Sequence, residues 1–290
     1  MELQWPLILF TTLVAWSAGT FGAQGALALA GKARSAQLPC LAASVALLAL
    51  SGVAVFFHLE HWERIFNGFG HITSGITQEL IAIVLFVAAA AAYLACLRKS
   101  GDGTVPRWCA ALAVAVSLVL AAVCAHSYVM AARPAWDSVL EVLSIVGLAC
   151  ALGPLTVASA LALEGEDASE AAVPAVAGSA VGAVCTAAYA AFLQAAAGSF
   201  VDGGFYIDPT HPTSGMADAA AAVAAQAPLL WGGAVVAGAL LPLALAVLAW
   251  KRGGASWKAL GPAAVALSLA GAVCLRMAFY GLGLSVFMFY

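Results

Sequence analysis

The chain has 290 residues, of which 64% are hydrophobic and only 9% are charged, and its mean hydropathy is +1.02. Soluble domains carry roughly a quarter charged residues, so this composition excludes an ordinary aqueous domain along the chain. The formal net charge of −3 and the lack of a basic block argue against nucleic-acid binding. We therefore expect an all-α integral membrane protein that forms a single domain over residues 1–290.

Eight apolar segments are long enough to cross the hydrocarbon core of a bilayer, which takes about 20 residues of helix. Polar and apolar residues do not alternate along them, so they are predicted to be helices and not barrel strands. We expect them to pack as two four-helix bundles. The segments lie near residues 5–30, 37–57, 76–97, 106–129, 138–163, 172–197, 226–250 and 259–289.

The seven cysteines lie singly within or beside these apolar segments, and none forms a C-x-x-C pair. Iron–sulfur and structural zinc sites are usually built from closely spaced cysteines. The sequence therefore predicts neither an iron–sulfur cluster nor any other metal site in this chain.

Lysine and arginine gather in three of the connections between the predicted helices. The opposite side holds only Arg64 and Arg133. Because basic residues favour cytoplasmic loops, both termini and the long loops after the second and sixth helices are predicted to be extracytoplasmic. The basic connections hold Lys32, Arg34, Arg98, Lys99, Arg107, Lys251, Arg252 and Lys258.

Six helices carry polar or ionisable residues near their predicted extracytoplasmic ends. Ionisable groups at membrane depth are costly and mark functional sites by default. Each residue alone also fits an interfacial position, but their convergence in one leaflet favours a single polar pocket. The other half of the membrane is expected to be almost purely apolar, which argues against a transport path. The residues are His58, Glu79, His126 with Tyr128, Glu141, Gln194 and Arg276.

The segment from His58 to Asn67 is the densest polar stretch of the chain. Histidine exchanges protons near neutral pH, and a histidine–carboxylate pair at a water-facing helix end can accept protons from a quinol hydroxyl. The alternative is that His58 only caps its helix and Arg64 only anchors the chain at the interface.

The same segment resembles the dimethyl sulfoxide reductase anchor subunit (DmsC) family. The family pattern H-L-x4-R-x-F-N and the glutamate of the third helix are matched by His58, Leu59, Arg64, Phe66, Asn67 and Glu79. Further matches follow in order along the whole chain: Trp5-Pro6-Leu7, Phe10-Thr11, Pro134, Trp136, Gly153-Pro154-Leu155, Arg276 and Phe279-Tyr280-Gly281. The chain departs from the pattern after His58-Leu59, where the family tends to have small residues. The terminal substrate of the complex therefore need not be dimethyl sulfoxide.

The resemblance implies a multi-pass anchor in the bacterial cytoplasmic membrane that serves anaerobic respiration and holds no haem or cluster itself. Such an anchor would oxidise menaquinol in the outer leaflet and pass electrons to a four-cluster, ferredoxin-like subunit with 4Fe-4S clusters. That subunit would feed a molybdopterin catalytic subunit. The family's roles at the quinol site fall on His58 and Glu79, with Arg64 beside them. The full candidate set for quinol binding is His58, Arg64, Phe66, Asn67, Glu79, His126, Tyr128, Glu141, Arg276 and Tyr280.

Three other functions compete with this interpretation. A cytochrome b-type anchor needs axial histidines inside helices. Only His126 is clearly within a predicted helix, so one haem is conceivable and two are not. The second alternative is a secondary transporter, and the third is a purely structural anchor. An optical spectrum of the purified complex would identify haem, and co-purification of iron–sulfur and molybdenum subunits would separate the others.

Overall fold

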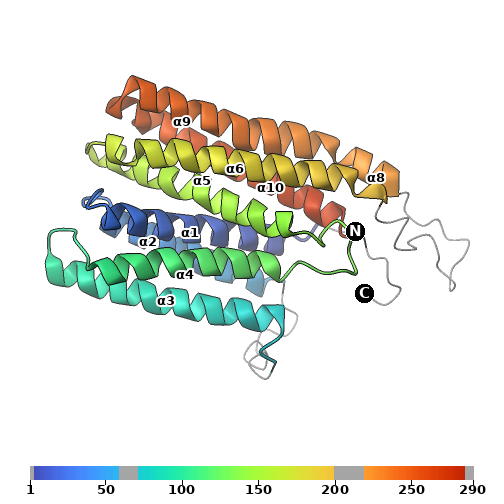
Figure 1. Ribbon diagram of the computed structural model, residues 1–290, viewed down its shortest axis with the longest axis horizontal. Helices are drawn as coiled ribbons and strands as arrows, with labels where there is room; N and C mark the ends of the chain where they lie inside the picture. Colours follow the sequence, from blue (N-terminus) through green and yellow to red (C-terminus); the bar gives the residue numbers. More distant parts are fainter. Residues whose placement is uncertain (1–2, 59–70, 199–218, 285–290) are drawn as a thin grey trace, which may run out of the picture.

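The computed structural model describes residues 3–58, 71–198 and 219–284, which form a long bundle of roughly aligned helices (Figure 1). Eight helices in this part of the chain are long and apolar enough to cross a membrane, and it contains no strand. The predicted all-α membrane protein with eight spans is thus confirmed.

Most of the helix bounds fall close to those predicted. The last helix is an exception, because it ends at Gly281 instead of continuing to residue 289. Beyond it the chain turns so that Gly283 packs against Trp136. The helices are α1 (Trp5–Leu29), α2 (Gln37–Phe56), α3 (Gly75–Ser100), α4 (Arg107–His126), α5 (Val139–Glu164), α6 (Ser169–Ala195) and α10 (Trp257–Gly281). The seventh span joins α8 (Ala219–Ala225), a π-helical segment (Pro228–Leu240) and α9 (Leu241–Arg252).

Local sequence sets several of these helix ends. Gly101 ends α3 with φ of +70°, and Gly165 ends α5 with φ of +83°, a left-handed conformation that glycine adopts without steric cost. At the start of α5, the Ser138 hydroxyl accepts a hydrogen bond from the backbone N–H of Leu140. Such a cap satisfies a donor that the helix itself leaves unpaired.

The helices form two four-membered rings, as predicted. In the first bundle, α1 packs against α2 and α4, and α3 completes the ring. The second bundle consists of α5, α6, the seventh span and α10. The two bundles join mainly where α1 packs on α5. A Cβ atom on Gly19 would overlap the backbone carbonyl of Ala149, and one on Gly153 would overlap that of Gly19, so these glycines allow the two backbones to touch.

The two ends of the molecule differ in their ionisable residues, and Figure 1 shows the helix connections gathered at each end. One end holds His58, His71 and His126 and is called here the histidine end. The α1–α2, α3–α4 and α9–α10 connections lie together at the opposite end, the basic end. All eight lysines and arginines that were assigned to one side by the charge count lie at or beside these connections.

The half of the first bundle toward the basic end is less apolar than predicted. Gln24, Gln37 and Tyr93 are all buried there. The Tyr93 hydroxyl donates to Gln37 Oε1 at 2.7 Å, and Gln37 Nε2 donates to the carbonyl of Gln24 at 3.3 Å. The expectation of an almost purely apolar half is therefore wrong. The Tyr93 and Gln37 side chains are buried with hydrogen bonds, whereas the buried Gln24 side-chain amide forms none of acceptable geometry in the described structure.

Candidate functional site

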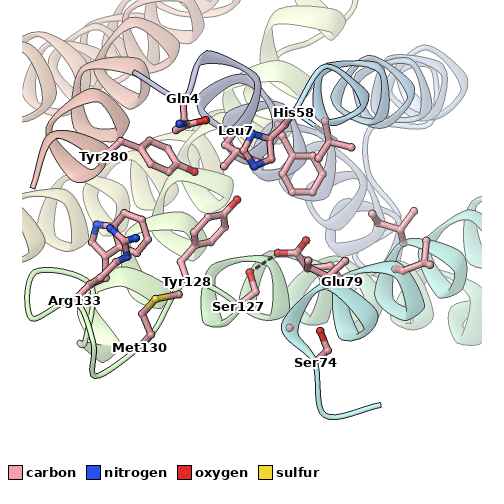
Figure 2. Close-up of a pocket in the computed structure, with 17 residues that line it drawn as sticks. Gln4, Leu7, His58, Ser74, Glu79, Ser127, Tyr128, Met130, Arg133 and Tyr280 are labelled. Atoms are coloured by element: carbon pink, nitrogen blue, oxygen red, sulfur yellow. Dashed lines mark hydrogen bonds between the residues drawn. The ribbon is translucent and has the colours of Figure 1, made fainter. Parts of the chain in front are cut away.

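A cavity of about 450 Å³ lies at the histidine end of the first bundle (Figure 2). Its walls come from the start of α1, the end of α2, the first turns of α3, the segment from Ser127 to Trp136 and the end of α10. Most of the lining is apolar or aromatic. The polar side chains that reach it include His58, Glu79, Tyr128 and Tyr280.

Two candidate residues, His58 and Glu79, enter the cavity from neighbouring helix ends. His58 follows the last turn of α2 and is exposed, whereas Glu79 is partly buried in the second turn of α3. The Ser127 hydroxyl donates a hydrogen bond to the Glu79 carboxylate (Figure 2). Among the described residues, the carboxylate's hydrogen-bond partner is thus a serine, and the histidine shares the same cavity.

A glycine allows this contact between α3 and the end of α4. A Cβ atom on Gly75 would lie 2.9 Å from the Cβ atom of Ser127, closer than real side chains approach. With no side chain at Gly75, the start of α3 lies against Ser127, and the serine reaches Glu79 one turn further along. The first turn of α3 therefore sets the position of the carboxylate.

An aromatic cluster forms the wall toward the second bundle. The Trp136 ring stacks on Phe279 with centroids 4.4 Å apart, and its indole N–H donates to the Phe279 carbonyl at 2.8 Å. Tyr128 lies edge-on to Tyr280, with ring centroids 6.2 Å apart. These contacts fix the chain segment between α4 and α5 against the end of α10.

Two tyrosine hydroxyls point toward the space in front of His58 (Figure 2). The Tyr280 hydroxyl is buried and makes no hydrogen bond of acceptable geometry in the described structure, although it lies near enough to Tyr128 for the two phenols to interact electrostatically. Burial raises the pKa of Tyr128 well above its ordinary value, so that phenol remains a neutral donor. A buried hydroxyl without a hydrogen bond is uncommon in folded proteins, and this one is free to donate to a molecule in the cavity.

Several polar residues that line the cavity were not among the sequence candidates, including Gln4, Ser127 and Arg133. The Arg133 guanidinium lies over the Trp136 ring, 4.7 Å from its centroid, and donates a hydrogen bond to the Gly283 carbonyl. Arg133 could have been selected, because it is one of only two basic residues in the connections on that side of the chain. Nothing in the sequence distinguishes Ser127 from the other serines.

The other candidates lie elsewhere or outside the described residues. Glu141 and Arg276 are buried within the second bundle and pair with each other, with Nη1 2.6 Å from Oε1. The Arg276 guanidinium also lies 4.9 Å from the Phe279 ring centroid. His126 is exposed at the end of α4 and does not line the cavity. The remaining candidates, Arg64, Phe66 and Asn67, lie outside the described residues.

Within residues 3–58, 71–198 and 219–284, no three histidine, cysteine, aspartate or glutamate side chains converge in a way that could hold a metal ion. The chemistry that these residues offer is proton exchange and hydrogen bonding. The cavity thus combines mostly apolar walls with a few polar groups.

Fold and site together define a helical membrane protein with eight spans and an amphipathic cavity at one end of its first bundle. The model of the DMSO reductase anchor subunit (DmsC) family matches residues 1–282, and the chain belongs to this family. It is therefore a membrane anchor of a complex of the DMSO reductase type, which implies catalytic and iron–sulfur partner subunits. A comparison with curated proteins gave no match.

Proposed function

We propose that the chain oxidises menaquinol in the cavity beside His58 and passes the electrons to an iron–sulfur partner subunit. One observation carries this proposal. The cavity of about 450 Å³ has apolar and aromatic walls, and it brings together a histidine, a carboxylate and a buried tyrosine hydroxyl without a partner. Ligand sites are typically apolar pockets with a few convergent polar groups.

Two side chains of the cavity each accept one of the two protons that a quinol loses on oxidation. His58 is exposed, so its ring can accept one hydroxyl proton and release it to water. Glu79 accepts the second and releases it to water through the cavity that it shares with the exposed His58, while the Ser127 hydrogen bond holds its carboxylate in place. Tyr280 donates to a quinol oxygen. The quinol also loses two electrons. These electrons reduce the 4Fe-4S clusters of a four-cluster, ferredoxin-like partner subunit. A molybdopterin subunit then reduces the terminal substrate.

The same proposal assigns a side to each end of the molecule. Basic residues favour the cytoplasm, so the histidine end and both termini face outward from a bacterial inner membrane. The partner docks at this end, because electrons leave where quinol is oxidised. Proton release and terminal reduction on one face move no net charge across the membrane. The complex then adds no membrane potential of its own.

Cysteine labelling on intact cells tests this orientation. Thr73 and Ser100 are both exposed, at the histidine end and the basic end respectively. Thr73→Cys should react with an impermeant thiol reagent when the partner subunits are absent, and Ser100→Cys should not. The unsubstituted chain, with its seven native cysteines, sets the background. The reverse labelling pattern would invert the orientation.

The quinol site is tested in the intact complex with two histidine variants. His58→Ala should abolish turnover with menaquinol but leave turnover with an artificial dye donor, which delivers electrons directly to the partner subunits. His126→Ala is the matched control, because His126 is exposed at the same end and does not line the cavity. Equal loss of both activities in His58→Ala would mean that the residue holds the complex together.

A further inference from the structure

A second cavity, of about 790 Å³, runs along the first bundle between α2 and α3. Every side chain that lines it is apolar except Arg98, which lies at its basic end. Several lining residues are exposed on the surface of the bundle, among them Val45 and Val87, with 45% and 52% of their areas accessible. The cavity is therefore a groove that faces lipid, and it is called here the α2–α3 groove.

Small side chains and loose packing create this groove. Ala42, Ala46 and Ala49 follow one face of α2 at helical spacing and line it. The two helices pack only loosely on each other, because α2 packs mainly on α1 and α3 mainly on α4. The floor is rigid, since Phe86 is fully buried and lies edge-on to Phe21, with centroids 4.9 Å apart.

The groove and the cavity beside His58 are neighbours along α3. Ile83 lines both spaces. From Ile83 the groove follows α3 as far as Leu94, a distance of about 16 Å at the rise of an α-helix. A ligand bound beside His58 can therefore extend along the groove without leaving the surface of α2 and α3.

The opposite wall of the His58 cavity is closed to an extended chain. Trp136 is stacked on Phe279 and hydrogen-bonded to its carbonyl. Further along α1, its backbone touches that of α5 at Gly19. Among the described residues, the α2–α3 side thus offers a ligand tail a continuous apolar route into the membrane.

We infer that the α2–α3 groove binds the isoprenoid tail of the quinol whose ring lies beside His58. This inference rests on the proposed quinol site and adds a subsite to it. A phospholipid acyl chain with its phosphate at Arg98 is the main competing occupant. The tail fits better, because Ile83 lines both the groove and the ring cavity, and no side chain of the groove before Arg98 can form a hydrogen bond.

The groove contributes mainly by orienting the tail. Lipid is as apolar as the groove, so there is no gain from removing the tail from water, and the gain comes from side-chain packing. The expected effect on KM is therefore moderate. Filling the groove should raise KM about fivefold, which corresponds to about 1 kcal/mol.

The experiment compares two substitutions on the exposed face of α3 in the intact complex. Ala91 lines the groove, and Ala88, also exposed, does not. Each is replaced by tryptophan, and quinol oxidation is measured with a naphthoquinol that carries a long polyprenyl tail and with one that has no tail. Ala91→Trp should raise KM about fivefold for the long-tailed quinol alone. Ala46→Trp, on the opposite wall, should do the same, and Ala88→Trp should change neither KM.

Other outcomes would overturn the inference in distinguishable ways. A KM raised equally for both quinols would mean that the substitution distorts the ring cavity. Unchanged KM values for both would place the tail elsewhere and leave the proposed quinol site intact. Loss of a co-purified phospholipid in Ala91→Trp and Arg98→Gln, with KM unchanged, would identify the groove as a lipid site. If the unsubstituted complex oxidises neither quinol, both the groove inference and the proposed function fail.

Discussion

The two bundles differ in the surroundings of their ionisable residues. In the first, Glu79 lies at the edge of a cavity of about 450 Å³, and its hydrogen-bond partner among the described residues is a small serine side chain. In the second, Glu141 and Arg276 are almost fully buried and neutralise each other at 2.6 Å. The sequence places all three near the same end of the bundle. The packing of the surrounding helices, and not the position along them, leaves one carboxylate beside a cavity and closes the other into a buried ion pair.

The largest effect is expected from breaking the ion pair. Arg276→Met leaves the Glu141 carboxylate buried without its partner, which costs about 3–5 kcal/mol in buried pairs of this kind. The amount of assembled complex in the membrane should fall sharply, and turnover with menaquinol and with a dye donor should fall together.

A double variant controls for this interpretation of the ion pair. Arg276→Met combined with Glu141→Leu removes both charges and should recover much of the lost assembly, because apolar residues often replace a buried pair without loss. If Arg276→Met instead assembles normally and loses only menaquinol turnover, the pair belongs to the quinol site and the contrast between the bundles fails.

The next effect concerns Glu79, which we propose accepts a proton from the quinol. Glu79→Gln keeps the shape and the hydrogen bond to Ser127 but removes the proton acceptor. The kcat for menaquinol should fall on the order of 10²-fold, the usual contribution of a positioned base. Binding of a quinol-site inhibitor, measured by titration, should change much less. Unaltered kinetics would place Glu79 outside the mechanism.

A smaller effect is expected at the unpartnered tyrosine. Tyr280→Phe removes one hydroxyl and keeps the ring packed beside Phe279, with its centroid 5.0 Å away in the native chain. Loss of one neutral hydrogen bond of about 1 kcal/mol should raise KM for menaquinol about fivefold. Steady-state kinetics with the Phe variant tests this. A KM unchanged within error would mean that water, and not quinol, is the partner of this hydroxyl.

The smallest expected effect concerns Tyr128, whose ionisation should not change the affinity for a quinol-site inhibitor at moderately alkaline pH. Burial raises the pKa of this phenol, so the neutral form is favoured in the folded protein. Its contribution persists below the ordinary tyrosine value of about 10 and is lost only as pH rises through the raised pKa. Inhibitor affinity should therefore show no loss from tyrosine ionisation between about pH 8 and 10. A decline in the native chain that Tyr128→Phe abolishes would contradict this.

The sequence predicts the helices well because apolar length and turn residues are local properties. It also selects His58 and Glu79 as candidates, and the structure shows that both line one cavity. The sequence does not predict contacts between side chains on different helices, because these depend on how the helices pack. Nothing local shows that Glu141 and Arg276 pair with each other, or that Gly75 brings Ser127 against Glu79. Likewise, the sequence gives Gln37 only as a polar residue at the start of a helix. The structure shows that it is buried and accepts a hydrogen bond from Tyr93.

Photolabelling tests the central claim, that quinol binds in the first bundle at the histidine end, most directly. A menaquinol analogue with a photoreactive group on its ring is bound to the intact complex, irradiated, and the labelled peptides are identified. Labels should fall on the start of α3 and on residues 127–138, and excess menaquinol should suppress them. Labels that fall instead on α6 or α9 of the second bundle, and are suppressed in the same way, would contradict the claim.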